Sequence, residues 1–259
     1  MVKSNKSVVE ISNLSFSYGK QQVNILNDVN AKIYEGCLTI VLGKNGSGKS
    51  TFLRLISGLL LNRSGSIKIY GKELNEIRNY DRARLLSFLP QNHKSVFPFK
   101  VSDVVLTGRA PYSGFFPNSK DIQKAHNALS KLNLIHLKDR IYSELSGGEQ
   151  QLVMISRIIA QETKLIILDE PISHLDFNNQ IRVIKLLKKM VAEEFTIVIS
   201  IHDPNLAFLS GDDFLLVNGG KIICPDNEKP WENSELNEVF NKDISKLDYK
   251  NKKLFIPEI

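Results

Sequence analysis

Residues 43–50 read Gly43-Lys44-Asn45-Gly46-Ser47-Gly48-Lys49-Ser50, which fits the pattern G-x-x-x-x-G-K-[ST]. The apolar run Leu38–Leu42 comes directly before it, and a helical pattern over Ser50–Leu60 follows. A glycine-rich turn between a buried strand and a helix directs backbone N–H groups and the positive end of the helix toward an anion. The sequence therefore predicts a phosphate-binding loop within an α/β fold.

Individual positions of this loop have predicted tasks. Lys49 is expected to reach the β and γ phosphates of a nucleotide, and the Ser50 hydroxyl is expected to bind Mg²⁺. The residues expected to line the nucleotide are Gly43, Lys44, Asn45, Gly46, Ser47, Gly48, Lys49, Ser50 and Thr51. A nucleoside triphosphate with Mg²⁺ is therefore the expected ligand.

A second apolar run, Leu165–Leu168, ends in two carboxylates, Asp169 and Glu170. Ligands of open α/β sheets gather at the carboxyl ends of the strands. We expect Asp169 to hold Mg²⁺ through water and Glu170 to accept a proton from the attacking water. Kinases, helicases and GTPases share the phosphate loop, but the Asn-Lys-x-Asp element of GTPases is missing from the sequence.

The rest of the chain predicts short buried strands that alternate with amphipathic helices. Several of the strands are continuous apolar runs, which is typical of a parallel sheet covered on both faces. The further strands expected are Val8–Leu14, Ile67–Tyr70, Leu86–Leu89, Thr196–Ile201, Phe214–Val217 and Lys221–Cys224, and the further helices are Asp121–Leu132, Glu149–Ala160 and Asn179–Ala192. Residues 92–143, with three prolines and no obvious strand, predict a mainly helical insertion.

The composition is that of a globular protein. Of the 259 residues, 42% are hydrophobic and 24% are charged, which excludes a disordered chain. The apolar runs are only as long as strands, so no membrane span is expected. The basic start, residues 1–6, has no apolar segment behind it, so we expect no secretory signal and an intracellular protein. Cys37 and Cys224 are expected to be free thiols, because neither lies in a metal-binding spacing.

The net charge of +6 is unevenly spread along the chain. Residues 54–140 carry 15 basic and 6 acidic side chains, whereas residues 141–259 carry 13 basic and 19 acidic ones. A basic segment suits nucleic acid, polyphosphate or an anionic membrane surface, and it equally suits a solvated face with scattered lysines. The charge alone leaves the partner open.

The segment Leu145-Ser146-Gly147-Gly148-Glu149-Gln150-Gln151 resembles the signature sequence of ATP-binding cassette (ABC) ATPases. Ser146 and two glycines before a helix also predict a second anion site at a helix N-terminus. The resemblance implies that ATP is the nucleotide and that two copies face head to tail. Each ATP then lies between the phosphate loop of one copy and Ser146, Gly147, Gly148 and Glu149 of the other.

Four further elements match the family in order along the chain. Tyr18 matches the aromatic residue that stacks on adenine, and Gln91 resembles the glutamine that touches Mg²⁺ or water and relays to the membrane subunit. The segment Ser173-His174-Leu175-Asp176 resembles the one that crosses the dimer interface. His202 matches the histidine that contacts the γ-phosphate. The resemblance covers residues 7–225, and it implies catalytic roles for Glu170, His202 and Gln91.

Two positions depart from the family pattern, and two segments point to one of its branches. Ile172 stands where Thr is usual, and Pro204 stands where Leu is usual, which removes a backbone donor beside His202. The segment Thr107-Gly108-Arg109-Ala110-Pro111-Tyr112 resembles one typical of ATPases that power import of iron-siderophores, haem and cobalamin. The run from His202 to Ala207 also resembles that branch.

The resemblance implies a single ABC ATPase domain over residues 1–259. Its expected parts are a RecA-like core with a mixed sheet (about 1–91 and 144–225), a helical subdomain (about 92–143), a small antiparallel β subdomain and a C-terminal tail (about 226–259). The implied function is the ATPase of a metal-chelate importer at the cytoplasmic face of a bacterial or archaeal membrane. Its implied partners are a second copy, a permease and, indirectly, a solute-binding protein; no nucleic acid is expected. An importer of another metal ion or an oxyanion, a soluble ABC ATPase and a small-molecule kinase remain as alternatives.

Overall fold

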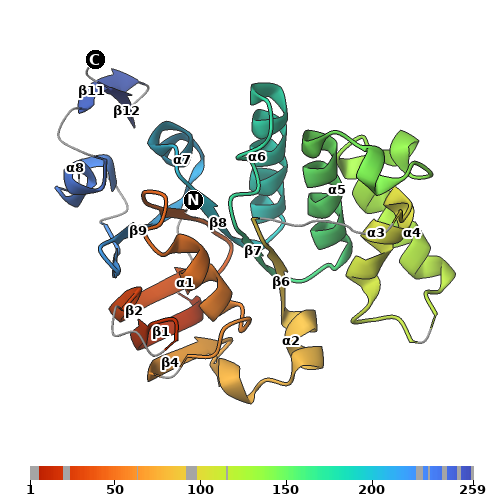
Figure 1. The fold of residues 1–259 in the computed structure, drawn as a ribbon, viewed down its shortest axis with the longest axis horizontal. Helices are drawn as coiled ribbons and strands as arrows, with labels where there is room; N and C mark the ends of the chain where they lie inside the picture. The colour runs from red at the N-terminus through yellow and green to blue at the C-terminus, as the bar shows by residue number, and fades with distance from the viewer. Residues whose placement is uncertain are drawn as a thin grey trace. The chain divides into compact units, whose positions relative to one another are not determined.

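A computed structural model describes residues 6–19, 24–62, 64–91, 98–114, 116–225, 230–232, 234–240, 244–249 and 252–257. The chain forms two compact units, which are considered separately below (Figure 1). The first unit combines Met1–Ile77 with Leu186–Ile259, and the second is Arg78–Lys185. The long helix α6 (Phe177–Ala192) begins in the second unit and ends in the first.

The first unit contains strands of a mixed sheet in the order β10-β9-β3-β8. Its strands are β3 (Leu38–Leu42), β8 (Thr196–Ile201), β9 (Asp213–Asn218) and β10 (Lys221–Ile223). Strand β3 lies parallel to both β8 and β9, and every residue of β3 and β8 is buried. Burial on both faces is the reason that these strands are continuous apolar runs.

A tight hairpin joins β9 to β10 in the first unit. Asn218 pairs with Lys221, which leaves Gly219 and Gly220 as a two-residue loop, with φ of 53° and 80°. Positive φ at both positions is the type I′ turn, whose twist matches that of the flanking strands. The Asn-Gly-Gly sequence therefore forms the hairpin that it predicts.

A second, antiparallel sheet of the first unit has the order β2-β1-β4-β5. Its strands are β1 (Ser7–Phe16), β2 (Leu26–Tyr34), β4 (Ser64–Ile69) and β5 (Lys72–Glu73). This sheet is the expected small antiparallel β part. Strand β2 is absent from the strands that the sequence predicts, although Val29, Ala31 and Ile33 alternate with exposed residues.

The helices of the first unit are α1 (Lys49–Ile56), α7 (Pro204–Ser210) and α8 (Glu235–Phe240). Helix α1 ends four residues before the predicted Leu60. The N–H groups of Gly58 and Leu59 bond back to the carbonyls of Leu55 and Arg54, which closes the last turn. Strands β11 (Ile244–Tyr249) and β12 (Lys252–Pro257) form a C-terminal hairpin that packs through β12 against α7.

The second unit is mostly helical around two parallel strands, β6 (Leu86–Leu89) and β7 (Leu165–Leu168). Its helices are α2 (Asn79–Leu85), α3 (Val101–Leu106), α4 (Ser119–Lys131) and α5 (Gly147–Ala160), of which the last three pack against one another. Short 3₁₀ turns, η2 (Thr107–Arg109), η3 (Ile135–Leu137) and η4 (Tyr142–Glu144), join them. Within the described part of 92–143 the only strand-like contact is an isolated bridge between Lys100 and Ile141, so this segment is helical as predicted.

Helix α4 begins where the sequence places its cap. The Asn118 side chain accepts bonds from the N–H groups of Lys120 and Asp121, and the Asp121 carboxylate in turn accepts a bond from the N–H of Asn118. This reciprocal capping fixes the first turn.

No helix in the described part of the chain is long and apolar enough to cross a membrane. Cys37 is buried and Cys224 is exposed, and neither forms a disulfide within the described part of the chain.

Candidate nucleotide site

The phosphate loop joins the end of β3 to the start of α1 in the first unit. Gly46 and Gly48 have φ of 78° and 108°, a left-handed region in which a side chain would strain the backbone. A Cβ on Gly43 would lie 2.6 Å from the carbonyl oxygen of Val217 and 2.8 Å from the Ser47 hydroxyl. Gly46 and Gly48 are thus required by their backbone conformation, and Gly43 is required because a side chain would not fit there.

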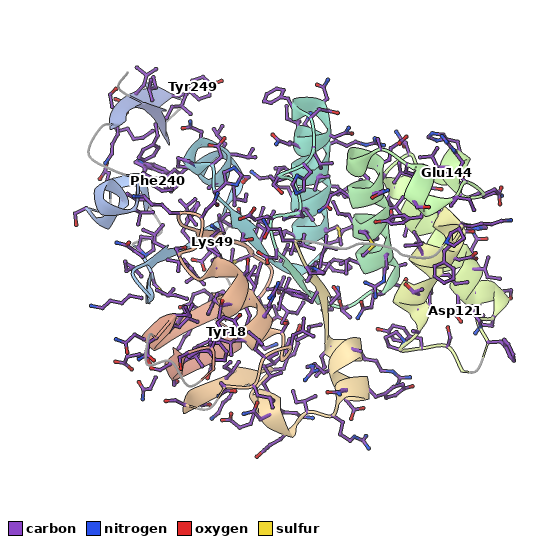
Figure 2. The ribbon with its side chains drawn as sticks, in the orientation of Figure 1. Tyr18, Lys49, Asp121, Glu144, Phe240 and Tyr249 are labelled. Carbon is purple, nitrogen blue, oxygen red and sulfur yellow. The ribbon has the colours of Figure 1, made fainter. Side chains whose placement is uncertain are left out.

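Lys49 is the first residue of α1 and is 4% exposed. Its ammonium group donates to the carbonyl oxygens of Gly43, at 2.8 Å, and Lys44, at 3.0 Å. These bonds hold the ammonium group over the loop, where the helix N-terminus adds partial positive charge. Figure 2 labels Lys49 and Tyr18, which both belong to the first unit.

The geometry of the phosphate loop itself suits a polyphosphate. The Ser47 hydroxyl oxygen is buried and has no hydrogen-bond partner within the described part of the protein. A buried hydroxyl without a partner is costly, and an acceptor such as a phosphate oxygen would satisfy it. The expected Mg²⁺ ligands offer a hydroxyl (Ser50), a carboxylate (Asp169) and an amide (Gln91), and oxygen donors of this kind are those that Mg²⁺ prefers.

Tyr18 lies beside the start of α1. Its ring meets that of Phe16 edge to face, with 5.0 Å between the ring centroids, and its hydroxyl lies 3.3 Å from that of Thr51. The side chain is 46% exposed, so one ring face is open to a planar ligand. The sequence links Tyr18 to adenine by resemblance only, whereas the structure places it next to the phosphate-loop helix.

In the second unit, Asp169 and Glu170 follow β7 as predicted, and both are buried. The amide nitrogen Nε2 of Gln91 donates to Oε2 of Glu170 at 2.9 Å. Gln91 follows β6, so the parallel pairing of β6 with β7 brings the two residues to the same sheet edge. The structure thus joins two predicted catalytic residues, a contact that the sequence does not predict.

Glu170 has an unusual backbone, with φ of 47°. Non-glycine residues seldom adopt the left-handed region, and when they do, they are often found at functional sites. The Ser173 hydroxyl and N–H both donate to the Glu170 carbonyl oxygen, at 3.0 and 3.4 Å, and hold this turn closed. The backbone therefore sets the direction of the carboxylate.

Ser146 caps helix α5 in the second unit. Its N–H and hydroxyl donate to Oε2 of Glu149, at 2.9 and 2.8 Å, and the N–H of Glu149 donates back to the hydroxyl oxygen. The two Ser146 donors hold the pKa of Glu149 below its usual value, so the carboxylate stays ionised at neutral pH. Gly147 and Gly148 form the first turn, so the helix start is narrow and exposes backbone N–H groups.

The segment Ser173-His174-Leu175-Asp176 lies next to the start of α5 within the second unit. A Cβ on Gly148 would contact the Leu175 side chain at 3.7 Å and the His174 carbonyl oxygen at 4.0 Å. Asp176 accepts a bond from the N–H of Asn179, which is the main reason that the pKa of Asp176 is lowered. The structure brings this segment next to the signature-like segment of the same chain, a contact that the sequence does not predict.

His202 follows β8 in the first unit and is exposed. Asp203 caps α7 by accepting bonds from the N–H groups of Asn205 and Leu206, and Pro204 is the first residue of the helix. A proline at this position removes an N–H that would have no helical partner, and its φ suits the helix start. The departure at Pro204 is thus compatible with the local structure.

The predicted residues fall into two groups, one in each unit. The first unit holds the phosphate loop, Tyr18 and His202, and the second holds Gln91, Asp169, Glu170, Ser146 and Asp176. Within each unit, hydrogen-bond contacts join some of these residues, namely Tyr18 with Thr51 and Gln91 with Glu170.

Gly108 and Arg109, the centre of the branch-specific segment, are buried in the second unit. Nε of Arg109 lies 3.1 Å from Oδ1 of Asp121, and its Nη1 lies 2.7 Å from the Ala160 carbonyl oxygen and 3.1 Å from Oε2 of Glu162. A Cβ on Gly108 would lie 2.3 Å from the Arg157 carbonyl oxygen. These residues join η2 to α4 and α5.

We expect Gly108→Ala to lower the free energy of unfolding by about 1–3 kcal/mol, because the added methyl overlaps the backbone of α5. Chemical denaturation of the full chain measures this loss. Gly114→Ala is the matched control, since a Cβ on Gly114 meets nothing within 4 Å, and the control is expected to stay within about 0.5 kcal/mol of the parent. Equal stability of the two variants would contradict the close approach.

Comparisons with known proteins show the family of this chain. The sequence model of the ABC transporter family matches residues 26–173. A probable iron chelatin transport ATP-binding protein of Helicobacter pylori is 37% identical over 220 residues, which cover 83% of this chain and 86% of that protein. The molybdate import ATP-binding protein MolC of Haemophilus influenzae is 38% identical over 217 residues, which cover 83% of this chain and 80% of MolC.

A solved structure shows the same fold over nearly the whole chain. It is an inward-facing conformation of a protein described as a metal-chelate type ABC transporter, with a TM-score of 0.82 and 33% identity. The match covers 97% of this chain and 97% of that one. The α/β fold with a mixed sheet, helices and an antiparallel sheet is therefore that of an ABC ATPase cassette.

Proposed function

Because this chain belongs to the ABC transporter family as the ATP-binding subunit of an importer, we propose that it drives uptake of a metal chelate through a separate permease. The chelate class is that of iron-siderophore, haem or cobalamin. The observation that carries the coupling is the hydrogen bond between Gln91 and Glu170. It links the residue expected to respond to the permease with the residue expected to take the proton during hydrolysis.

ATP and Mg²⁺ are the proposed ligands of the site. Lys49 and the backbone of the phosphate loop bind the phosphates, the Ser47 hydroxyl gains a partner, and Tyr18 stacks on adenine. Ser50, Asp169 and Gln91 supply the protein ligands of Mg²⁺, whose positive charge neutralises the developing charge on the phosphates. Glu170 accepts the proton of the attacking water, and His202 contacts the γ-phosphate.

A second copy of the chain completes the proposed site. One chain carries two elements proposed to bind anions, the phosphate loop before α1 and the capped start of α5. In the proposed head-to-tail dimer, the Ser146 end of α5 faces the γ-phosphate held by the other copy. The adjacent Asp176 segment then lies at the dimer interface, where the ionised carboxylate accepts hydrogen bonds.

Exposed aromatic side chains in the second unit form a proposed contact for the permease. The Arg84 guanidinium lies 4.3 Å from the Tyr80 ring centroid and 5.5 Å from that of Tyr112, and its Nε donates to the Pro111 carbonyl oxygen. Tyr80, Tyr112 and Phe116 are 53%, 36% and 86% exposed. Aromatic and arginine side chains are enriched at protein interfaces. Docking there places the subunit at the cytoplasmic face of the membrane.

Affinity purification of the chain from detergent-solubilised membranes of its own host tests this function. We expect a polytopic permease in the eluate, and we expect its solute-binding protein to bind an iron chelate, haem or cobalamin in a direct binding assay. A solute-binding protein that binds molybdate or another oxyanion would move the chain to the alternative that the similarity to MolC supports. Recovery of ribosomes or DNA without a permease would contradict the importer function.

A Tyr112→Ala variant tests the docking surface. We expect less permease in the eluate, because the change removes an exposed ring that contacts Arg84 and Arg109. Tyr249→Ala, which removes a ring of similar exposure (44%) in the C-terminal hairpin, is the matched control and should leave the permease yield unchanged. Equal yields with the two variants would contradict docking at the aromatic patch.

A further inference from the structure

Asn205 lies three residues after His202, in the first turn of α7. The backbone on one side of His202 is fixed by β8, whose last residue, Ile201, is buried. On the other side, Asp203 and α7 fix the chain. The position of the exposed His202 side chain therefore depends on how firmly the start of α7 is held.

The side-chain amide of Asn205 pairs with the backbone of β12. Its Nδ2 donates to the Phe255 carbonyl oxygen at 3.0 Å, and its Oδ1 accepts from the Phe255 N–H at 2.7 Å. An amide carries one donor group and one acceptor, so it takes the place that a neighbouring strand residue would occupy. Replacement of Asn205 by any apolar residue would leave both backbone groups of Phe255 without these partners.

Aromatic packing strengthens the same contact. Phe208, one turn after Asn205, is fully buried, and its ring stacks on that of Phe255 with a centroid distance of 5.3 Å and an angle of 29°. The ring centroids of Trp231 and Phe208 lie 6.1 Å apart, and the Lys246 ammonium group donates to the Trp231 carbonyl oxygen. The β11–β12 hairpin is thus fixed to α7 by paired hydrogen bonds and by rings.

We propose that Asn205 is a positioning residue for His202 and that the β11–β12 hairpin is the support against which it acts. The proposal rests on the function given above, in which His202 contacts the γ-phosphate. Phe255 lies 50 residues after Asn205, so the C-terminal segment takes part in catalysis through α7 without touching ATP. Loss of the amide pair leaves the rings in contact but frees the first turn of α7 to shift.

The test uses the full chain in complex with its permease, with Asn205→Ala as the variant. We expect kcat for ATP hydrolysis to fall between about 10- and 100-fold, because small misplacements of catalytic groups have effects of this size. KM for ATP should change by less than about twofold, since the phosphate loop is untouched. Hydrogen exchange should become faster at the backbone N–H groups of residues 205–210.

Asn30→Ala is the matched control. Asn30 also uses its side-chain amide on two backbone groups, accepting from the Asn13 N–H at 3.0 Å and donating to the Asp28 carbonyl oxygen at 3.2 Å. Its loss in the antiparallel sheet should leave kcat and the exchange of α7 unchanged. A fall in kcat that is the same for both variants would show that general loosening is responsible, and it would overturn the proposal.

The double variant His202→Ala/Asn205→Ala separates positioning from an independent structural role. If Asn205 acts through His202, the double variant is no slower than His202→Ala alone. If the fall in kcat of the double variant equals the product of the falls in the two single variants, the proposal is overturned. It is also overturned if Asn205→Ala keeps the kcat of the parent while His202→Ala is inactive. Full activity of His202→Ala would overturn the role of His202 in the proposed function itself, and the positioning role with it.

Discussion

Replacement of Glu170 by glutamine stops ATP turnover while ATP stays bound. The glutamine amide has nearly the same shape as the carboxylate that it replaces but cannot accept a proton from water, so the general-base contribution is lost. Such a contribution is worth about 10²- to 10⁴-fold in rate. Phosphate release in a single turnover measures the loss, and light scattering with ATP present should show that the variant accumulates as a dimer.

Glu194→Gln is the matched control for this experiment. Glu194 is exposed, and like Glu170 it has a left-handed backbone, with φ of 65° against 47°. The control therefore makes the same chemical change on the same kind of backbone, and turnover should be retained. Rapid phosphate release by Glu170→Gln would exclude Glu170 as the base, whereas loss of ATP affinity would indicate a role in binding.

Replacement of Lys49 by alanine weakens ATP binding itself. Its buried ammonium group donates to two loop carbonyl oxygens, so the change deletes the charge that faces the phosphates and also loosens the loop. Charge-assisted hydrogen bonds contribute about 1.5–3 kcal/mol each. Loss of one or two of them weakens binding by roughly 10- to 10⁴-fold. Isothermal titration with ATP and Mg²⁺ measures this change.

Lys72→Ala serves as the control for Lys49→Ala. Lys72 is an exposed residue of β5 in the same unit, so its removal lowers the net charge equally without altering the loop. The control should bind ATP with the affinity of the parent. Thermal unfolding of both variants shows whether the fold is retained, and unchanged ATP affinity of a folded Lys49→Ala would contradict the phosphate-loop role.

The buried strands are the part of the fold that the sequence predicts best. Strands β3, β6, β7 and β8 have the bounds expected from their apolar runs, because a strand covered on both faces stops where polar residues begin. The sequence does not predict strand β2, because Asn27 and Asp28 are both exposed and the register shift there interrupts the alternation of apolar residues. The sequence does not predict β11 and β12 either, because apolar and polar residues are mixed there as well.

For the site, the sequence predicts which residues take part but not how they meet. Spacing along the chain places Asp169 and Glu170 at the end of a strand, and the glycine pattern places the phosphate loop. The bond between Gln91 and Glu170 joins residues 79 positions apart, and it depends on the pairing of β6 with β7. The positive φ of Glu170 has no counterpart in the sequence, because glutamate seldom adopts it.

The burial of Gly108 and Arg109 bears on how transporter genes acquire new cargo. Both residues serve the packing of η2 against α4 and α5, and neither is exposed enough to meet a solute or to distinguish one permease from another. A lineage can therefore exchange its cargo-binding components while Gly108 and Arg109 stay fixed by the interior of the helical unit. The identities of these two residues would then trace the ancestry of the cassette, and the history of the transported compound would have to be read from the permease.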